Sequence, residues 1–251
     1  MSEAIKDLLY RIADDELILG HRGSELTGLG PILEEDIAFS SIAQDQIGHA
    51  LANYTILHEQ FGEPEPDSIA FARGERLYKN SQFVELPIGE YDFSLMRHFL
   101  FDHSESCRYE LLQSSSFTPL AALAKKIKGE LKYHTLHADL WIAKLGNATE
   151  ESHARMQSAL NEAMPYALGI FEPSDYEGEL IANGTFVGEK KLQAVWLERI
   201  MPVIERAHLA LPDLSKIEPK FGGRHGYHTE YLLPLLDEMS EVYRFDSAAV
   251  W

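Results

Sequence analysis

The sequence has little cysteine, and it has no long apolar run. Cys107 is the one thiol in 251 residues, which excludes an intrachain disulfide and a cysteine-bound metal cluster and is typical of a reducing compartment. No apolar stretch approaches the roughly 18 to 20 residues of a membrane-spanning helix, and acidic residues interrupt the first apolar segment, so neither a membrane anchor nor a signal peptide is expected. We therefore expect a cytoplasmic protein that does not contact membranes.

Positive charge is also scarce. Lys and Arg number 22 against 40 Asp and Glu, which gives a formal net charge of −18. An electrostatic field of this sign repels nucleic-acid phosphates and anionic lipid headgroups. We therefore do not expect nucleic acid as a partner.

Apolar residues recur at spacings of three and four, whereas period-two alternation is never sustained, so the sequence predicts helices and no strands. We expect an all-α helical bundle with additional C-terminal helices, forming a single domain over residues 1–251. Long helices are predicted at residues 3–21, 32–59, 91–112, 119–145, 149–171, 189–210 and 227–243. The connection at 61–87 is rich in turn residues, with one short helix at 68–73, and residues 173–188 are predicted to form a loop.

Bundles of the ferritin-like kind bind two irons with one Glu from each of two helices and a Glu-x-x-His pair from each of two others. The literal matches are Glu150 with His153 and Glu205 with His208. A motif this short arises readily by chance, and Glu150 lies at a polar helix start, where an acidic residue suits the helix dipole. These pairs are weak candidates.

A better candidate is a polar cluster that we expect to be buried inside the bundle. Asp45 and His49 lie on the helix predicted at 32–59, and Glu130, His134 and His137 lie on the helix predicted at 119–145. Residues three and four apart share a helix face, so each set points one way. Glu130 follows Asp45 by 85 positions, which indicates a degenerate internal duplication.

The residue three after each carboxylate is not the His of the di-iron motif. Gly48 follows Asp45, and Tyr133 follows Glu130, and this departure counts against a di-iron site. A metal site built on the four-residue spacing stays open as an alternative. Further ligands for such a site are Glu16, Asp102, His103 and Glu105. We favour internal pairing of these polar groups, a vestige of a metal site, because buried charges need a partner.

Two other groups of residues are noteworthy. A basic run, Lys125, Lys126, Lys128 and Lys132, suits the phosphates of an acyl-coenzyme A, although such runs more often form a solvated helix face. After Gly222 and Gly223 come His225, His228 and Glu230. We expect these three to cap a helix and anchor a loop.

Three stretches resemble the C subunits of bacterial phenylacetyl-CoA 1,2-epoxidases, which are ring-oxygenating complexes. They are FARGERLYKNSQFVELPIGEYDF at 71–93, GELKYHTLHADLWIAKLGN at 129–147 and GGRHGYHTEYLLPLLDEM at 222–239. The resemblance runs nearly from end to end, and strings of this length are far more specific than the short metal motifs. It implies a ferritin-like helical bundle and a structural subunit without catalytic residues.

The resemblance also implies partners. Such a subunit pairs with and stabilises a homologous A subunit that holds the di-iron centre, in a homodimer or hetero-oligomer. A small B subunit and a reductase with flavin, an iron–sulfur cluster and NADPH complete the complex, whose substrate is phenylacetyl-CoA. No cofactor or metal is then expected in this chain. Two alternatives stay open: a metal-dependent oxygenase that uses Asp45, His49, Glu130 and His134, and an iron-storage protein, for which inward carboxylates are few.

Overall fold

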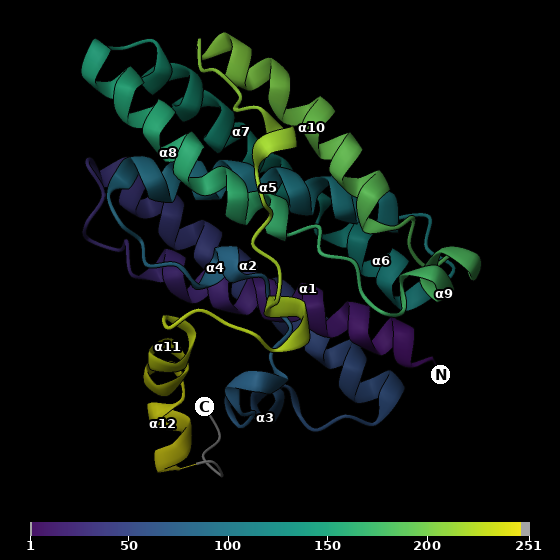
Figure 1. Cartoon of the computed structure of the whole chain (residues 1–251). Coiled ribbons are helices and arrows are strands. Elements are labelled where there is room, and N and C mark those ends of the chain that lie inside the picture. Colours follow the sequence, from purple (N-terminus) through teal and green to yellow (C-terminus); the bar gives the residue numbers. More distant parts are fainter. Residues whose placement is uncertain (1, 247–251) are drawn as a thin grey trace. The chain divides into compact units, whose positions relative to one another are not determined.

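The computed structural model describes residues 2–246, and helices dominate that range. It contains twelve α-helices and three short 3₁₀ helices, and no strand occurs among the described residues (Figure 1). The predicted all-α, ferritin-like fold with additional C-terminal helices is confirmed. None of the helices in 2–246 has both the length and the apolar character needed to cross a membrane.

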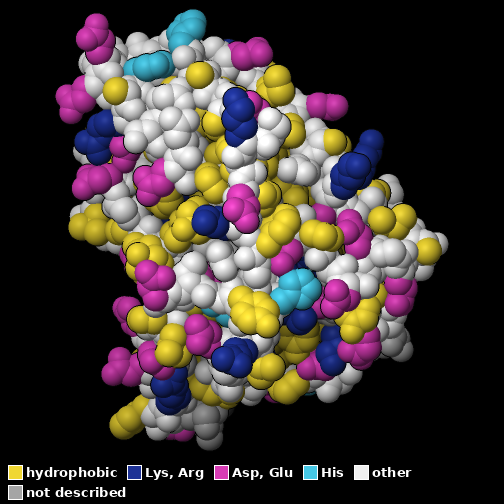
Figure 2. All heavy atoms as spheres, in the orientation of Figure 1, with side chains coloured by type: hydrophobic (Ala, Val, Ile, Leu, Met, Phe, Trp, Pro, Cys, Tyr) yellow, Lys and Arg dark blue, Asp and Glu magenta, His cyan; other side chains and the backbone are white. Residues whose placement is uncertain are grey.

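The described residues form two compact units. The first takes the chain up to Pro87 and from Gly222 onward, and the second takes Ile88–Phe221. On the face drawn in Figure 2, acidic side chains are scattered over the surface and not gathered in one patch. The negative charge on this face is therefore spread out.

The first unit is built on a pair of long helices, α1 (Glu3–Ser24) and α2 (Leu33–Phe61), which lie side by side (Figure 1). The Ser2 side chain accepts a hydrogen bond from the Ala4 N–H at 3.1 Å and so caps α1. Gly62, at φ 71°, ends α2 in the left-handed conformation that favours glycine. The smaller elements of this unit are α3 (Pro66–Phe71), η1 (Glu75–Leu77), α4 (Gln82–Glu85), η3 (Gly223–His225), α11 (Leu232–Met239) and α12 (Glu241–Phe245).

Two of the three strings that carry the resemblance pack against each other in this unit. A Cβ atom on Gly223 would lie 2.3 Å from the carbonyl oxygen of Asn80, and one on Gly226, at φ 78°, would lie 2.5 Å from that of Arg76. Only glycine permits so close an approach of two backbones. The Gly-rich string therefore lets the C-terminal segment lie directly on residues 76–80.

The second unit is organised around α5 (Tyr91–Leu112), which contacts α7 (Lys128–Gly146), α8 (Glu150–Gly169) and α10 (Glu189–Arg206) (Figure 1). The fully buried Trp196 of α10 donates its indole N–H to the Leu100 carbonyl of α5 at 2.9 Å. A capping box between Thr149 and Ser152 begins α8. The shorter elements are α6 (Thr118–Lys126), α9 (Glu177–Ala182) and η2 (Leu214–Lys216).

The extents of three predicted segments are wrong. The helix expected at 119–145 is two helices, α6 and α7, separated by Ile127 at φ −84° and ψ −2°. Gly129, a poor helix former, follows this turn, and the Ile127 carbonyl accepts from the Glu130 and Leu131 N–H groups to begin α7. The loop expected at 173–188 contains α9.

The third wrong extent is that of the helix predicted at 227–243. It begins only at Leu232 and is interrupted at Ser240, whose hydroxyl donates to the Leu236 carbonyl at 2.6 Å. The preceding residues bond to α4 instead, since Gln82 donates to the Tyr227 carbonyl at 2.9 Å. Tertiary contacts here override a helical pattern.

Glu85, at the end of α4, fixes the C-terminal segment to the N-terminal part of the first unit. This fully buried carboxylate is 2.6 Å from His228 Nδ1 and accepts from the Thr229 N–H and hydroxyl, each at 2.7 Å. Asn80 donates to it at 2.9 Å. His228 thus anchors the loop, as the sequence suggested.

We expect Glu85→Ala to lower the free energy of unfolding by about 3–5 kcal/mol, because it leaves the buried partners of the carboxylate without an acceptor. Urea unfolding followed by circular dichroism measures this loss. Glu59→Ala, at an exposed position of α2, is the control and changes stability by less than about 0.5 kcal/mol. A loss below about 1 kcal/mol at position 85 would show that these bonds do not hold the segment.

Candidate functional site

Three consecutive carboxylates of α1, Asp14, Asp15 and Glu16, are buried in the first unit at no more than 1% exposure. Asp14 accepts from two nitrogens of Arg73, at 2.5 and 3.0 Å, and from the Tyr54 hydroxyl at 2.5 Å. Burial, followed by the charge of Asp14, raises the pKa of Tyr54 well above its usual value. Tyr54 therefore stays a neutral donor to this carboxylate.

The next two carboxylates have different partners. Asp15 pairs with the buried Arg224 at 2.6 Å and accepts from the Ser81 N–H at 2.7 Å. Glu16 lies 3.5 Å from Nδ1 of the buried His49 on α2. The buried acids of α1 are thus distributed among separate partners and do not converge on one point.

A second polar network lies between α5 and α7 in the second unit. His98 uses Nδ1 to contact Asp102, and its Nε2 lies 3.1 Å from His137 Nδ1. His103 Nε2 lies 2.7 Å from Asp139 of α7. Burial is the largest single influence and opposes ionisation of Asp102, but the interactions with His98, His134 and His103 together lower the pKa of this carboxyl. Asp102 is therefore held as a carboxylate by histidine.

A third network joins α5 to the start of α10. The buried Arg108 donates to Glu105 at 2.9 Å and to Glu189 at 3.0 Å. Two carboxylates thus share one guanidinium. Glu105, considered above as a further metal ligand, is held by an arginine in this structure.

The five residues predicted to form one buried cluster are divided between the units. Asp45 and His49 lie on α2 of the first unit, and Glu130, His134 and His137 lie on α7 of the second. The three histidines are buried, whereas Asp45 is half-buried and Glu130 is exposed. Burial was wrongly expected for Glu130, because the break at Ile127 puts it in the first turn of α7, at a helix end that favours acidic residues.

The two literal Glu-x-x-His pairs have other roles. His153 Nδ1 lies 2.9 Å from the Gly146 carbonyl, so this histidine connects α8 to the end of α7. His208 lies beyond α10 at a φ of 55°, and Glu150 and Glu205 are exposed. The di-iron motif requires such pairs to face inward between helices, and these exposed glutamates do not.

The donor groups do not fit a di-iron centre. Among residues 2–246, no group of three or more His, Cys, Asp or Glu side chains is arranged to hold a metal ion. The two buried carboxylates of α5, Asp102 and Glu105, are engaged with His98 and Arg108, and an arginine beside a carboxylate repels a cation. A di-iron centre needs carboxylates and imidazoles from four helices aimed at one point.

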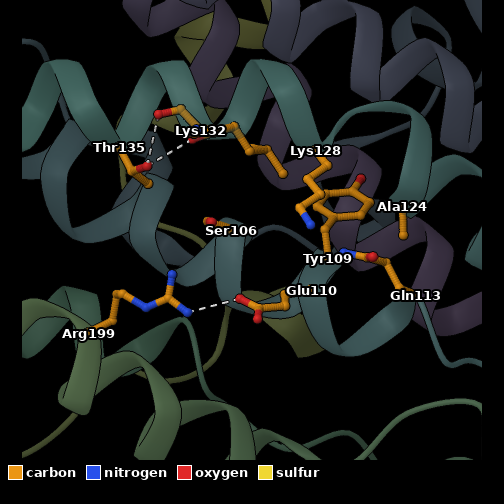
Figure 3. A pocket seen from close by; sticks show the side chains of 10 residues that line it. Ser106, Tyr109, Glu110, Gln113, Ala124, Lys128, Lys132, Thr135 and Arg199 are labelled. Atoms are coloured by element: carbon orange, nitrogen blue, oxygen red, sulfur yellow. Dashed lines mark hydrogen bonds and ion pairs between the residues drawn. The ribbon is translucent and has the colours of Figure 1, made fainter.

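A pocket of about 280 Å³ lies in the second unit among α5, α6, α7 and α10 (Figure 3). Of the four lysines predicted to contact phosphate, Lys128 and Lys132 line it, whereas Lys125 and Lys126 are exposed on α6 outside the lining. Arg199 of α10 completes the lining. No sequence signal pointed to Arg199, because no local pattern connects α10 to α7.

Comparison with known proteins identifies a family and a relative. The model of the family described as "Phenylacetic acid catabolic protein" matches residues 1–251. The chain is 31% identical over 241 residues to the C subunit of the 1,2-phenylacetyl-CoA epoxidase of Escherichia coli strain K12, and the match covers 96% of each chain. The resemblance inferred from the three sequence strings is confirmed over nearly the whole chain.

We expect Asp102→Asn to destabilise the protein by about 3 kcal/mol or more at neutral pH, since it removes the acidic partner of a buried pair. Folding lowers the pKa of Asp102. The ionised carboxylate therefore contributes fully to the free energy of unfolding above the usual carboxyl pKa, and this contribution is lost as the pH falls through the lower pKa of the folded state. The difference in unfolding free energy between wild type and variant therefore shrinks below about pH 4.

Urea unfolding at several pH values between about 3 and 7 measures this difference, with Asp175→Asn at an exposed position as the control. The control has the wild-type pH dependence. A difference for Asp102→Asn that persists unchanged at pH 3 would contradict the account of the pair.

Proposed function

Because the chain belongs to the phenylacetic acid catabolic protein family, we propose that it serves as the C subunit of a phenylacetyl-CoA epoxidase complex and that its role there is structural. The observation that carries the structural role is the pairing of buried carboxylates with Arg73, Arg224 and Arg108. These pairs connect α1 to the segment after α3 and to η3, and they connect α5 to α10. The acids are not arranged as an open set of metal ligands.

In the proposed complex the chain pairs with and stabilises a homologous A subunit, which holds the di-iron centre. A small B subunit and a reductase carrying flavin and an iron–sulfur cluster, supplied by NADPH, complete the system, and phenylacetyl-CoA is its substrate. The complex acts in the cytoplasm, in keeping with a single, buried cysteine. The match to an epoxidase C subunit over nearly the full length of both chains supports this assembly.

An apolar stripe on α7 supports a helical partner. Tyr133, Leu136 and Leu140 follow one another at spacings of three and four, and they are 47%, 53% and 62% exposed. On α2, Leu51 occupies the position 85 residues before Leu136 and is 50% exposed. A solvated helix face is normally polar, so we infer that a helix of the A subunit packs on the α7 stripe.

The first test is co-expression with the A subunit, followed by assays of the complete system with each chain omitted. We expect product from phenylacetyl-CoA only when both chains are present, because the A subunit supplies the chemistry and this chain stabilises it. This chain without the A subunit forms no product. Full activity of the A subunit in its absence would overturn the proposed function.

The second test concerns the stripe. We expect Leu136→Glu with Leu140→Glu to reduce co-purification of the A subunit at least tenfold, because charges on an obligate helix interface are costly to desolvate. The control is Ile181→Glu on α9, which is 51% exposed outside the stripe and retains the partner. Circular dichroism verifies that both variants are folded. Undiminished co-purification of the double variant would exclude the stripe as the interface.

A further inference from the structure

The pocket of the second unit has a positive lining in an acidic chain. Among the described residues that line it, Lys128, Lys132 and Arg199 are cationic and Glu110 is acidic. The whole chain has the opposite balance, with 22 basic against 40 acidic residues. A concave surface with this local excess of positive charge attracts anions and repels metal cations.

Helical spacing explains how these groups surround one space. Lys128 and Lys132 are four residues apart and share a face of α7, while Ser106 and Glu110 are four apart on α5. Figure 3 shows Lys132 on one side of the space and Arg199 with Glu110 on the other, with Ser106 between them. An anion in the pocket would therefore meet positive charge from two sides.

Neutral donors complete the lining. Ser106 on α5 and Gln113 at its C-terminal end contribute a hydroxyl and an amide. The Thr135 hydroxyl already donates to the Leu131 carbonyl at 3.1 Å. Thr135 therefore lines the pocket without donating to a bound anion. Ammonium, guanidinium and neutral donors around one space are the groups that bind phosphate in proteins.

Glu110 competes for the cation on its side of the pocket. Its carboxylate accepts from Arg199 at 2.9 Å, and both side chains are substantially exposed. An exposed ion pair of this kind contributes little to stability. Arg199 can therefore exchange Glu110 for an incoming anion at small cost.

We propose that this pocket binds a phosphate group of a coenzyme A thioester, with Lys128, Lys132 and Arg199 as its cationic contacts. The identity of the ligand as coenzyme A rests on the proposed function, whereas the phosphate chemistry follows from the lining. Coenzyme A presents a 3′-phosphate and a diphosphate. A pocket of about 280 Å³ has room for one such group.

Isothermal titration calorimetry of the full chain at low salt tests the site, with coenzyme A, 3′-dephospho-coenzyme A and inorganic phosphate as probes. We expect coenzyme A to bind, and Lys128→Glu with Lys132→Glu to weaken binding at least tenfold. The matched control is Lys125→Glu with Lys126→Glu, which makes the same charge change on neighbouring exposed positions outside the lining. The control stays within twofold of wild type.

A third variant, Glu110→Gln, tests the competition for Arg199. It is expected to raise the affinity for coenzyme A severalfold, which a purely structural role of Glu110 would not do. Circular dichroism shows that all variants are folded. Weaker binding of 3′-dephospho-coenzyme A assigns the 3′-phosphate to the pocket, and equal binding assigns the diphosphate.

Three outcomes would overturn the proposal. If no probe binds at low salt, the pocket is not a phosphate site. If the two double lysine variants lose affinity for coenzyme A equally, the binding reflects only the long-range charge of the surface. Binding of inorganic phosphate without coenzyme A removes coenzyme A as the ligand. Since these titrations use this chain without partners, their failure leaves the co-purification result intact, and the two proposals are tested separately.

Discussion

A carboxylate buried between helices needs a cationic or hydrogen-bonding partner. In both units this constraint decides whether the buried acids are available to bind a metal. In the first unit, Arg73 and Arg224 reach the acids of α1 from distant parts of the chain. In the second, Arg108 joins an acid of α5 to one of α10. Each carboxylate placed beside a guanidinium is lost as a ligand for a metal cation. A helical subunit whose buried acids pair with arginine is thus suited to a structural role, whereas a metal-bearing subunit needs those acids as ligands.

With its buried polar groups engaged internally, the chain has two outward features that suit an assembly. The stripe of Tyr133, Leu136 and Leu140 lies on α7, and the cationic pocket begins with Lys128 on the same helix. One helix therefore contributes to the proposed partner surface and to the proposed phosphate site. Its inner face, with His134 and His137, packs within the second unit. The helix α7 thus has one face in the core of the second unit, one in the proposed partner surface and one in the proposed phosphate site.

The sequence predicted the long helices well because their periodicity is local. The helix at 91–112 was predicted to the residue, since no Gly or Pro interrupts it. The break at Ile127 and the late start of α11 were missed, because they depend on a turn before Gly129 and on contacts with Gln82 and Glu85 far along the chain. The same distinction applies to the candidate site residues. The helical spacing predicted that the histidines of α2 and α7 are buried. The place of Arg199 in the pocket and the Asp15–Arg224 pair depend on tertiary contacts that leave no local pattern.

The most direct test of the central claim is the iron content of this chain, produced without its partners in iron-rich medium and treated with a chelator, together with its Mössbauer spectrum. Buried acids paired with arginine, and Glu-x-x-His pairs whose glutamates are exposed, predict far less than one iron per chain and no coupled pair. Two coupled irons per chain, lost on replacement of Asp45 or Glu130, would contradict the account and favour a metal-dependent oxygenase instead.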